Sequence, residues 1–88
     1  MALEFPDHAR SYESSQRRIR FCGQDDAKQV VFFLDEDAIF RLAPRTHNTE
    51  EAMLSAFDTA RQRIRDVATR LYAPADHRSF YILPASAF

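Results

Sequence analysis

Apolar and polar residues alternate along residues 17–23, which is the pattern of a half-buried β-strand. One side of this strand carries Ile19 and Phe21, and the other side carries Arg18, Arg20 and Cys22. After the turn-forming residues 24–27, residues 28–34 are rich in β-branched and aromatic side chains. The two segments therefore predict a β-hairpin.

The register of this hairpin follows from keeping its apolar residues on one face. Pairing Phe21 with Val30 and Ile19 with Phe32 groups these four side chains and leaves residues 24–27 as a four-residue loop. The opposite face then displays four residues: Arg18, Arg20, Val31 and Phe33.

Two shorter segments extend the predicted sheet. Residues 10–13 can turn back through the polar residues 14–16 and pair with the first strand. Residues 79–83 alternate again and form a last strand, and the polar residues 75–78 before it are expected to form a loop.

Two helices are predicted between the hairpin and the last strand. The first is short and ends near Leu42, with Asp35 as its N-cap. The second covers residues 48–73 and begins with a capping box formed by Asn48 and Glu51. Its apolar stripe, spaced by three and four residues, consists of Met53, Phe57, Ala60, Ile64, Val67 or Ala68, and Leu71.

Together these elements predict an α+β fold. An antiparallel β-hairpin or meander of three to four strands packs against one short and one long amphipathic helix, in the order β(β)β-α-α-β. At 88 residues the chain has room for one core. We therefore expect a single domain over residues 1–88, with residues 1–9 as an extended N-terminal arm.

Composition and charge narrow the class of protein. With 45% hydrophobic and 28% charged residues, the chain resembles folded rather than disordered proteins. A net charge of -1 provides no general attraction to nucleic acid or to anionic membranes. The first residues lack the features of a signal peptide, no long apolar run is present, and Cys22 is the only cysteine. We therefore expect a cytoplasmic protein without membrane contact.

The residue types that carry catalysis or bind metals are too scattered to predict a site. His8, His47 and His77 are not paired with each other or with cysteine, as a zinc site requires. Helix capping and turn formation explain the acidic residues at 25–26 and 35–37. One glycine cannot build a phosphate-binding loop. We therefore predict no catalytic residue, no metal, no cofactor and no small-molecule ligand.

A nucleic-acid interface is an alternative that the arginines of the first strand suggest. Arg18 and Arg20 beside Phe33 could combine phosphate contacts with base stacking, as in sheets that bind single strands. The aromatic motifs of RNA-binding sheets are missing, however, and an arginine over a phenylalanine ring is also an ordinary surface contact. On the long helix, the arginines are expected to form ion pairs with Asp58 and Asp66.

Residues 30–34 form an unbroken apolar run, which exceeds what a sheet covered by helices on one side requires. Something should cover the second face. The candidates are the N-terminal arm with Phe5 and Tyr12, the tail that ends in Phe88, and a second copy of the protein.

Several short motifs occur along the chain: Leu3-Glu4-Phe5-Pro6, Arg10-Ser11-Tyr12, Arg20-Phe21-Cys22-Gly23, Ala56-Phe57-Asp58 and Ala87-Phe88. Together they resemble a bacterial domain-of-unknown-function family, number fourteen-eighty-eight of that series. Two positions depart from the family pattern, since Cys22 stands where an aromatic residue is more usual and Ala87 where an aspartate is. The resemblance implies an α+β fold and a bacterial source, and it implies no activity.

The function that these observations favour is a cytoplasmic protein-interaction or accessory domain without catalytic activity, and a homodimer is one candidate form of it. Its interface would use Arg18, Arg20, Val31 and Phe33, because surplus apolar surface beside arginines is typical of interfaces. The alternatives are a nucleic-acid-binding module that uses the same strand face, and a small enzyme.

Overall fold

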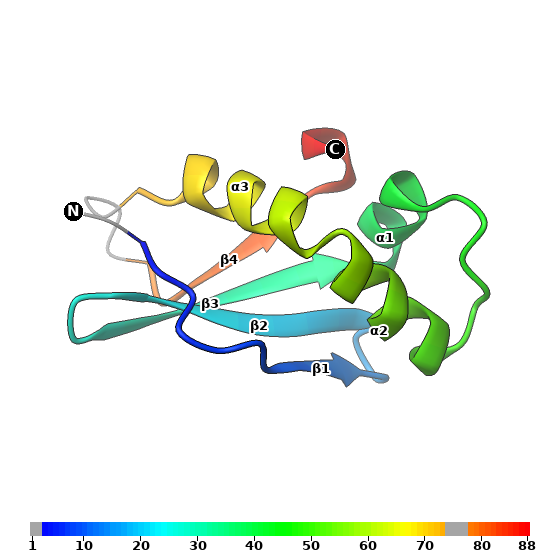
Figure 1. Ribbon diagram of the computed structural model, residues 1–88, viewed down its shortest axis with the longest axis horizontal. Coiled ribbons are helices and arrows are strands. Elements are labelled where there is room, and N and C mark those ends of the chain that lie inside the picture. The colour runs from blue at the N-terminus through cyan, green and yellow to red at the C-terminus, as the bar shows by residue number, and fades with distance from the viewer. Residues whose placement is uncertain (1–2, 74–77) are drawn as a thin grey trace.

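One mixed sheet and three helices make up the described part of the chain, residues 3–73 and 78–88 of the computed structural model. The elements are β1 (Arg10–Glu13), β2 (Arg18–Asp25), β3 (Lys28–Asp35), α1 (Glu36–Leu42), α2 (Glu50–Thr59), α3 (Arg61–Leu71), β4 (Phe80–Leu83) and the short turn of helix η2 (Ala85–Ala87). The helices cover one side of the sheet (Figure 1). The predicted α+β fold is confirmed.

The strands lie in the order β1-β2-β3-β4. The first three form an antiparallel meander, so the predicted strand at residues 10–13 is confirmed. By contrast, β4 runs parallel to β3, because the helices form a crossover that brings the chain back to the end of the sheet at which β3 begins. The sheet is therefore mixed. Most of the loop predicted for residues 75–78 lies outside the described residues.

The predicted hairpin register was wrong by two residues. Phe21 pairs with Phe32 and Ile19 pairs with Leu34, because the loop consists only of Asp26 and Ala27. Asp26 adopts a φ of 54°, the left-handed conformation that a tight loop requires and that aspartate tolerates. A shift of two residues keeps every side chain on its predicted face.

The single long helix predicted for residues 48–73 was also wrong, since α2 and α3 are separate helices joined at Ala60. The Thr59 hydroxyl donates a hydrogen bond to the carbonyl oxygen of Ser55 at 3.1 Å, a contact that bends helices. The Ala60 amide still donates to Ala56, and the Ile64 amide donates to Ala60. The helical path therefore bends rather than stops (Figure 1).

The core lies between the helices and the sheet. Phe32 is at its centre, with its ring 5.4 Å from that of Phe21 and 5.7 Å from that of Tyr81. The largest fully buried side chains are Phe32, Phe57, Ile19, Leu34, Ile39, Met53, Ile64, Leu83 and Val30. Leu71 departs from the predicted apolar stripe, because it is 39% exposed. None of the described helices is long and apolar enough to cross a membrane.

The N-cap of α2 is Thr49 rather than the predicted Asn48. The Thr49 hydroxyl accepts a hydrogen bond from the backbone amide of Ala52 at 3.1 Å. Asp35 does occupy the N-cap position of α1, but its side chain forms no capping hydrogen bond. Capping therefore stabilises the start of α2 and contributes little at α1.

We expect Thr49→Ala to lower the free energy of unfolding by about 1 kcal/mol, because the Ala52 amide loses its acceptor. The matched variant Asn48→Ala should change it by less than about 0.5 kcal/mol. Urea unfolding followed by circular dichroism measures both. If Asn48→Ala lowers the free energy of unfolding more than Thr49→Ala does, the N-cap is Asn48.

Candidate functional site

The face of the sheet opposite the helices is the candidate site, and we call it the open face. It is defined by Arg18, Arg20 and Cys22 of β2, Val31 and Phe33 of β3, and Phe80 and Ile82 of β4. The four residues predicted from the sequence all lie on it. Phe80 and Ile82, at 49% and 48% exposure, were missed.

The strand pairing arranges the open face in rows. Arg20, Phe33 and Ile82 are neighbours across β2, β3 and β4. The next row holds Cys22, Val31 and Phe80. The apolar side chains therefore gather over β3 and β4, at one edge of the sheet, and the arginines lie over β2.

Arg18 belongs to the structure of this face. Its guanidinium lies 3.6 Å from the centre of the Phe33 ring, and its Nε donates a hydrogen bond to Glu13 at 2.8 Å. Phe33 is only 9% exposed as a result of this stacking and of the Phe80 ring, 5.8 Å away. Arg18 and Phe33 thus already use on each other the contacts that nucleic acid would require.

Arg20 differs from Arg18 in its contacts. It is half-buried, and no hydrogen bond or ion pair joins it to any residue in the described part of the chain. It lines a hollow of about 220 Å³ together with Ser11, Cys22 and Gln29. A guanidinium held in this way can bind a carboxylate through two hydrogen bonds.

Cys22 lies in the same hollow as a free, half-buried thiol. Asp7 is the carboxylate that lines this hollow, and no histidine does so among the described residues, so the hollow lacks the imidazole base that usually activates a catalytic thiol. Across residues 3–73 and 78–88, no group of three or more His, Cys, Asp or Glu side chains could hold a metal ion. His77 lies outside the described residues.

The described N-terminal arm packs on the helix side of the sheet. The Phe5 ring lies 6.1 Å from the rings of both Phe21 and Phe32. Glu4 exchanges two backbone hydrogen bonds with Gln24, of 2.8 and 2.7 Å. Gly23 permits this crossing, because a Cβ atom there would lie 3.0 Å from Leu3 and 3.3 Å from a backbone oxygen.

Tyr12 also points to the helix side. It pairs with Ile19 in the sheet, and its hydroxyl lies 3.5 Å from Glu36 at the start of α1. Neither aromatic residue of the N-terminal segment therefore covers the open face.

The arginines of α3 hold both ends of the chain on this same side. Arg63 donates to the Phe88 carbonyl at 3.0 Å, and Arg65 donates to the Asp7 carbonyl at 3.0 Å. The expected pairs of Asp66 with Arg63 and Arg70 were wrong, since Asp66 accepts from Gln62. The arginines instead reach backbone carbonyls that are distant in sequence.

The expected pair of Asp58 with Arg61 is confirmed. Asp58 also accepts two hydrogen bonds of 2.9 Å from Arg10 of β1. These hydrogen bonds from Arg10 are the main reason that the pKa of Asp58 is lowered from its usual value. Asp58 therefore connects β1 to the bend between α2 and α3.

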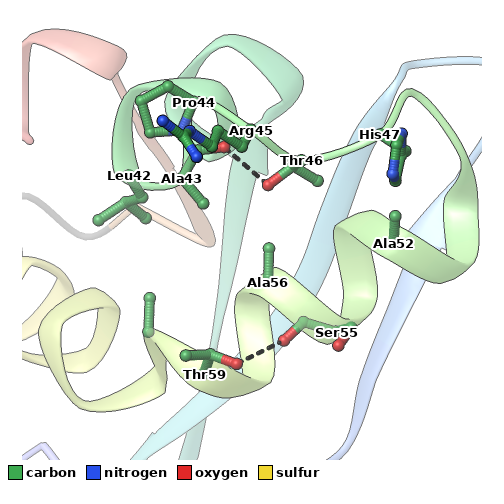
Figure 2. A pocket seen from close by; sticks show the side chains of 11 residues that line it. Leu42, Ala43, Pro44, Arg45, Thr46, His47, Ala52, Ser55, Ala56 and Thr59 are labelled. Carbon is green, nitrogen blue, oxygen red and sulfur yellow. Dashed lines mark hydrogen bonds between the residues drawn. The ribbon is translucent and has the colours of Figure 1, made fainter.

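A groove of about 630 Å³ lies between the α1–α2 loop and α2, and sequence analysis missed it. Ala52 and Ala56 point from α2 toward the loop, which carries Thr46 and His47 (Figure 2). Thr46 donates to the Ala43 carbonyl, and no carboxylate of residues 3–73 and 78–88 lines the groove. The signal that could have found it is the run of small residues on one side of α2. His47 has no acid or base beside it there, so the groove offers no catalytic set.

Asp25 and Tyr72 form a buried polar contact outside the open face. The Tyr72 hydroxyl donates to Asp25 Oδ2 at 2.6 Å, and Asp25 is 7% exposed. Its other oxygen, Oδ1, has no partner among the described residues. This contact joins the end of α3 to the tip of the β2–β3 hairpin. The hydrogen bond to Asp25, followed by burial, raises the pKa of Tyr72 to about 12.

The chain is similar to a known protein family and to a solved structure. Residues 3–83 match the family described as "Protein of unknown function (DUF1488)". A crystal structure of a protein of unknown function from that family, from Shewanella loihica PV-4, is similar with a TM-score of 0.79 and 18% identity. The match covers 92% of this chain and 90% of that one. No curated protein matches the sequence.

The Tyr72 contact predicts how stability depends on pH. A raised pKa means that the stability contributed by this hydrogen bond is complete below pH 10.0 and is lost as the pH rises toward about 12. Tyr72→Phe should therefore be less stable than the wild type below pH 10.0, and the two should converge near pH 12. Absorbance titration at alkaline pH should show one late-titrating phenol fewer in Tyr72→Phe than in the wild type.

Proposed function

Because the chain belongs to the DUF1488 family, whose description names no activity, we propose its function from the geometry of the open face. We propose a non-catalytic protein-interaction domain that binds a second copy of itself. The interface includes the exposed Phe80 and Ile82 of β4, at the apolar edge of the open face.

The observation that carries this proposal is the exposure of Phe80 and Ile82 on a face that no described element covers. The sequence offered three covers for the surplus apolar residues. The described parts of the arm and of the tail pack on the helix side, against the core. A second copy is the remaining candidate.

The make-up of the face supports the same conclusion. Phe80 rests edge-to-face on Phe33, so its ring is held in place before a partner arrives. Aromatic and arginine side chains dominate the binding energy of protein interfaces, and Arg20 lies in the row beside Phe33. An apolar centre with an arginine at its side matches the anatomy of such interfaces.

A catalytic role finds little support. Neither the α2 groove nor the hollow lined by Arg78, Ser79, Phe80 and Ile82 brings together a nucleophile, a base and an acid. The half-buried free thiol of Cys22 fits a reducing compartment, and we place the protein in the cytoplasm. The organism of the similar crystal structure, Shewanella loihica, supports a bacterial source.

Sedimentation velocity over a range of concentrations tests self-association. We expect dimers at micromolar concentration, and the double variant Phe80→Ser/Ile82→Ser should weaken dimerisation by at least about tenfold, because both exposed apolar side chains are lost. Leu71→Ser is the matched control, since Leu71 is a comparably exposed apolar residue on α3, and it should leave the dimer intact. A wild-type protein that stays monomeric at high micromolar concentration would refute the proposal.

Nucleic-acid binding through Arg18, Arg20 and Phe33 is tested separately. We expect no retention of random single-stranded DNA or RNA at about 50 mM salt, because Arg18 is paired with Glu13 and stacked on Phe33. Filter binding over a salt series measures this. Retention that falls steeply with salt and is lost in Arg20→Gln would favour the nucleic-acid function instead.

A further inference from the structure

The two edges of the sheet differ in chemistry. The edge strand β1 carries Arg10, which is bound to Asp58, and Glu13, which is bound to Arg18. The other edge strand, β4, has the sequence Phe-Tyr-Ile-Leu and carries no charge. Proteins usually protect sheet edges with charged residues, because an unprotected edge pairs with other strands. β1 is protected in this way and β4 is not.

The backbone of β4 is available on its outer side. Its ladder with β3 is the only backbone pairing of residues 80–83 with another segment in the described part of the chain. A hollow of about 520 Å³ lies along it, lined by Arg78, Ser79, Phe80 and Ile82. The free edge is therefore continuous with the apolar part of the open face.

We propose that two copies pair antiparallel through β4 and form one continuous eight-stranded sheet. This inference rests on the proposed self-association and specifies its geometry. The alternative geometry is a stack of two open faces. Edge pairing gives both copies the backbone hydrogen bonds that β4 lacks, whereas face stacking leaves that edge unpaired.

Symmetry restricts how the strands can pair. When two copies of one strand pair antiparallel, the two-fold axis that relates them is perpendicular to the sheet. Each residue then lies opposite a residue of the partner, and the two residue numbers differ by an even amount. With the axis at Tyr81, Phe80 of one copy lies opposite the partner's Ile82. Both side chains point to the open face, and each Phe80 ring enters the hollow that lies beside β4 of the partner.

The charge of β4 is compatible with a second copy as its partner. Residues directly opposite each other in a symmetric pair come from the same short strand, and like charges there would repel. β4 contains none, so its own copy is a compatible partner. All six helices of the dimer then lie on one side of the sheet, and the two open faces join on the other.

Distances between spin labels at Ser11 test the geometry. Ser11 is an exposed residue of β1, and the label is attached through Ser11→Cys in a Cys22→Ser background. In an eight-stranded sheet the two β1 strands are seven strand spacings apart, so pulsed electron resonance should give about 30–35 Å. Stacked open faces would bring the labels to about 10–26 Å, with the longest value for a stack centred over β3 and β4.

The outcomes distinguish edge pairing from the proposed self-association on which it rests. A dimer with the long distance supports edge pairing, and a dimer with the short distance overturns edge pairing while self-association stands. A monomer overturns both. Circular dichroism of the labelled protein establishes that it is folded, so that a monomer is not mistaken for an unfolded chain.

A pair of single variants tests the register itself. Phe80→Lys and Ile82→Asp should each weaken dimerisation by at least about tenfold when studied alone. Mixed together, they should form a heterodimer, because the new cation and the new anion face each other while the remaining Phe80 faces the remaining Ile82. If the mixture associates no better than either variant alone, the Tyr81-centred pairing is wrong.

Discussion

The structure depends on one constraint, which is that β3 is apolar on both of its faces while helices cover only one. Val30, Phe32 and Leu34 are buried against the helices. Val31 and Phe33 point the other way, and the Arg18 guanidinium and the Phe80 ring pack against Phe33 there. A strand of this kind normally lies in a sheet covered on both sides. The second layer is what the described chain lacks.

The described parts of the N-terminal arm and of the C-terminal tail pack on the helix side of the sheet, which is already covered. The arm crosses β2 at Gly23 and packs Phe5 on the core, and the arginines of α3 bind carbonyl oxygens of both terminal segments. Motifs that carry the family resemblance, near Leu3 and near Gly23, meet at this crossing. Since these segments strengthen the helix side, they leave Phe80 and Ile82 of the open face exposed.

How much of this was predictable from the sequence depends on the range of the interactions. Alternation of period two identified the face of Arg18, Arg20, Val31 and Phe33, because a strand keeps that alternation whatever its register. It could not identify the register, which a two-residue loop at Asp26 decides. Phe80 and Ile82 were missed as site residues because only the crossover places β4 beside β3.

The errors in the helices have the same origin. Spacing of three and four residues predicted the buried stripe from Met53 to Ala68. The bend at Ala60 follows a single side-chain hydrogen bond from Thr59, which periodicity does not report. Arg63 and Arg70 were expected to pair within the helix, yet they bind the carbonyls of Phe88 and Ala87, contacts that only the folded chain brings within reach.

An uncharged edge strand is a hazard in most proteins, because edge pairing can repeat without limit. Here the two ends of the sheet differ in a way that limits it. Pairing through β4 consumes both free edges and leaves β1 at each end of the combined sheet. β1 has only four residues, and its Arg10 and Glu13 are charged and held by Asp58 and Arg18. The proposed association through β4 would therefore close at two copies, since the edges that remain are protected.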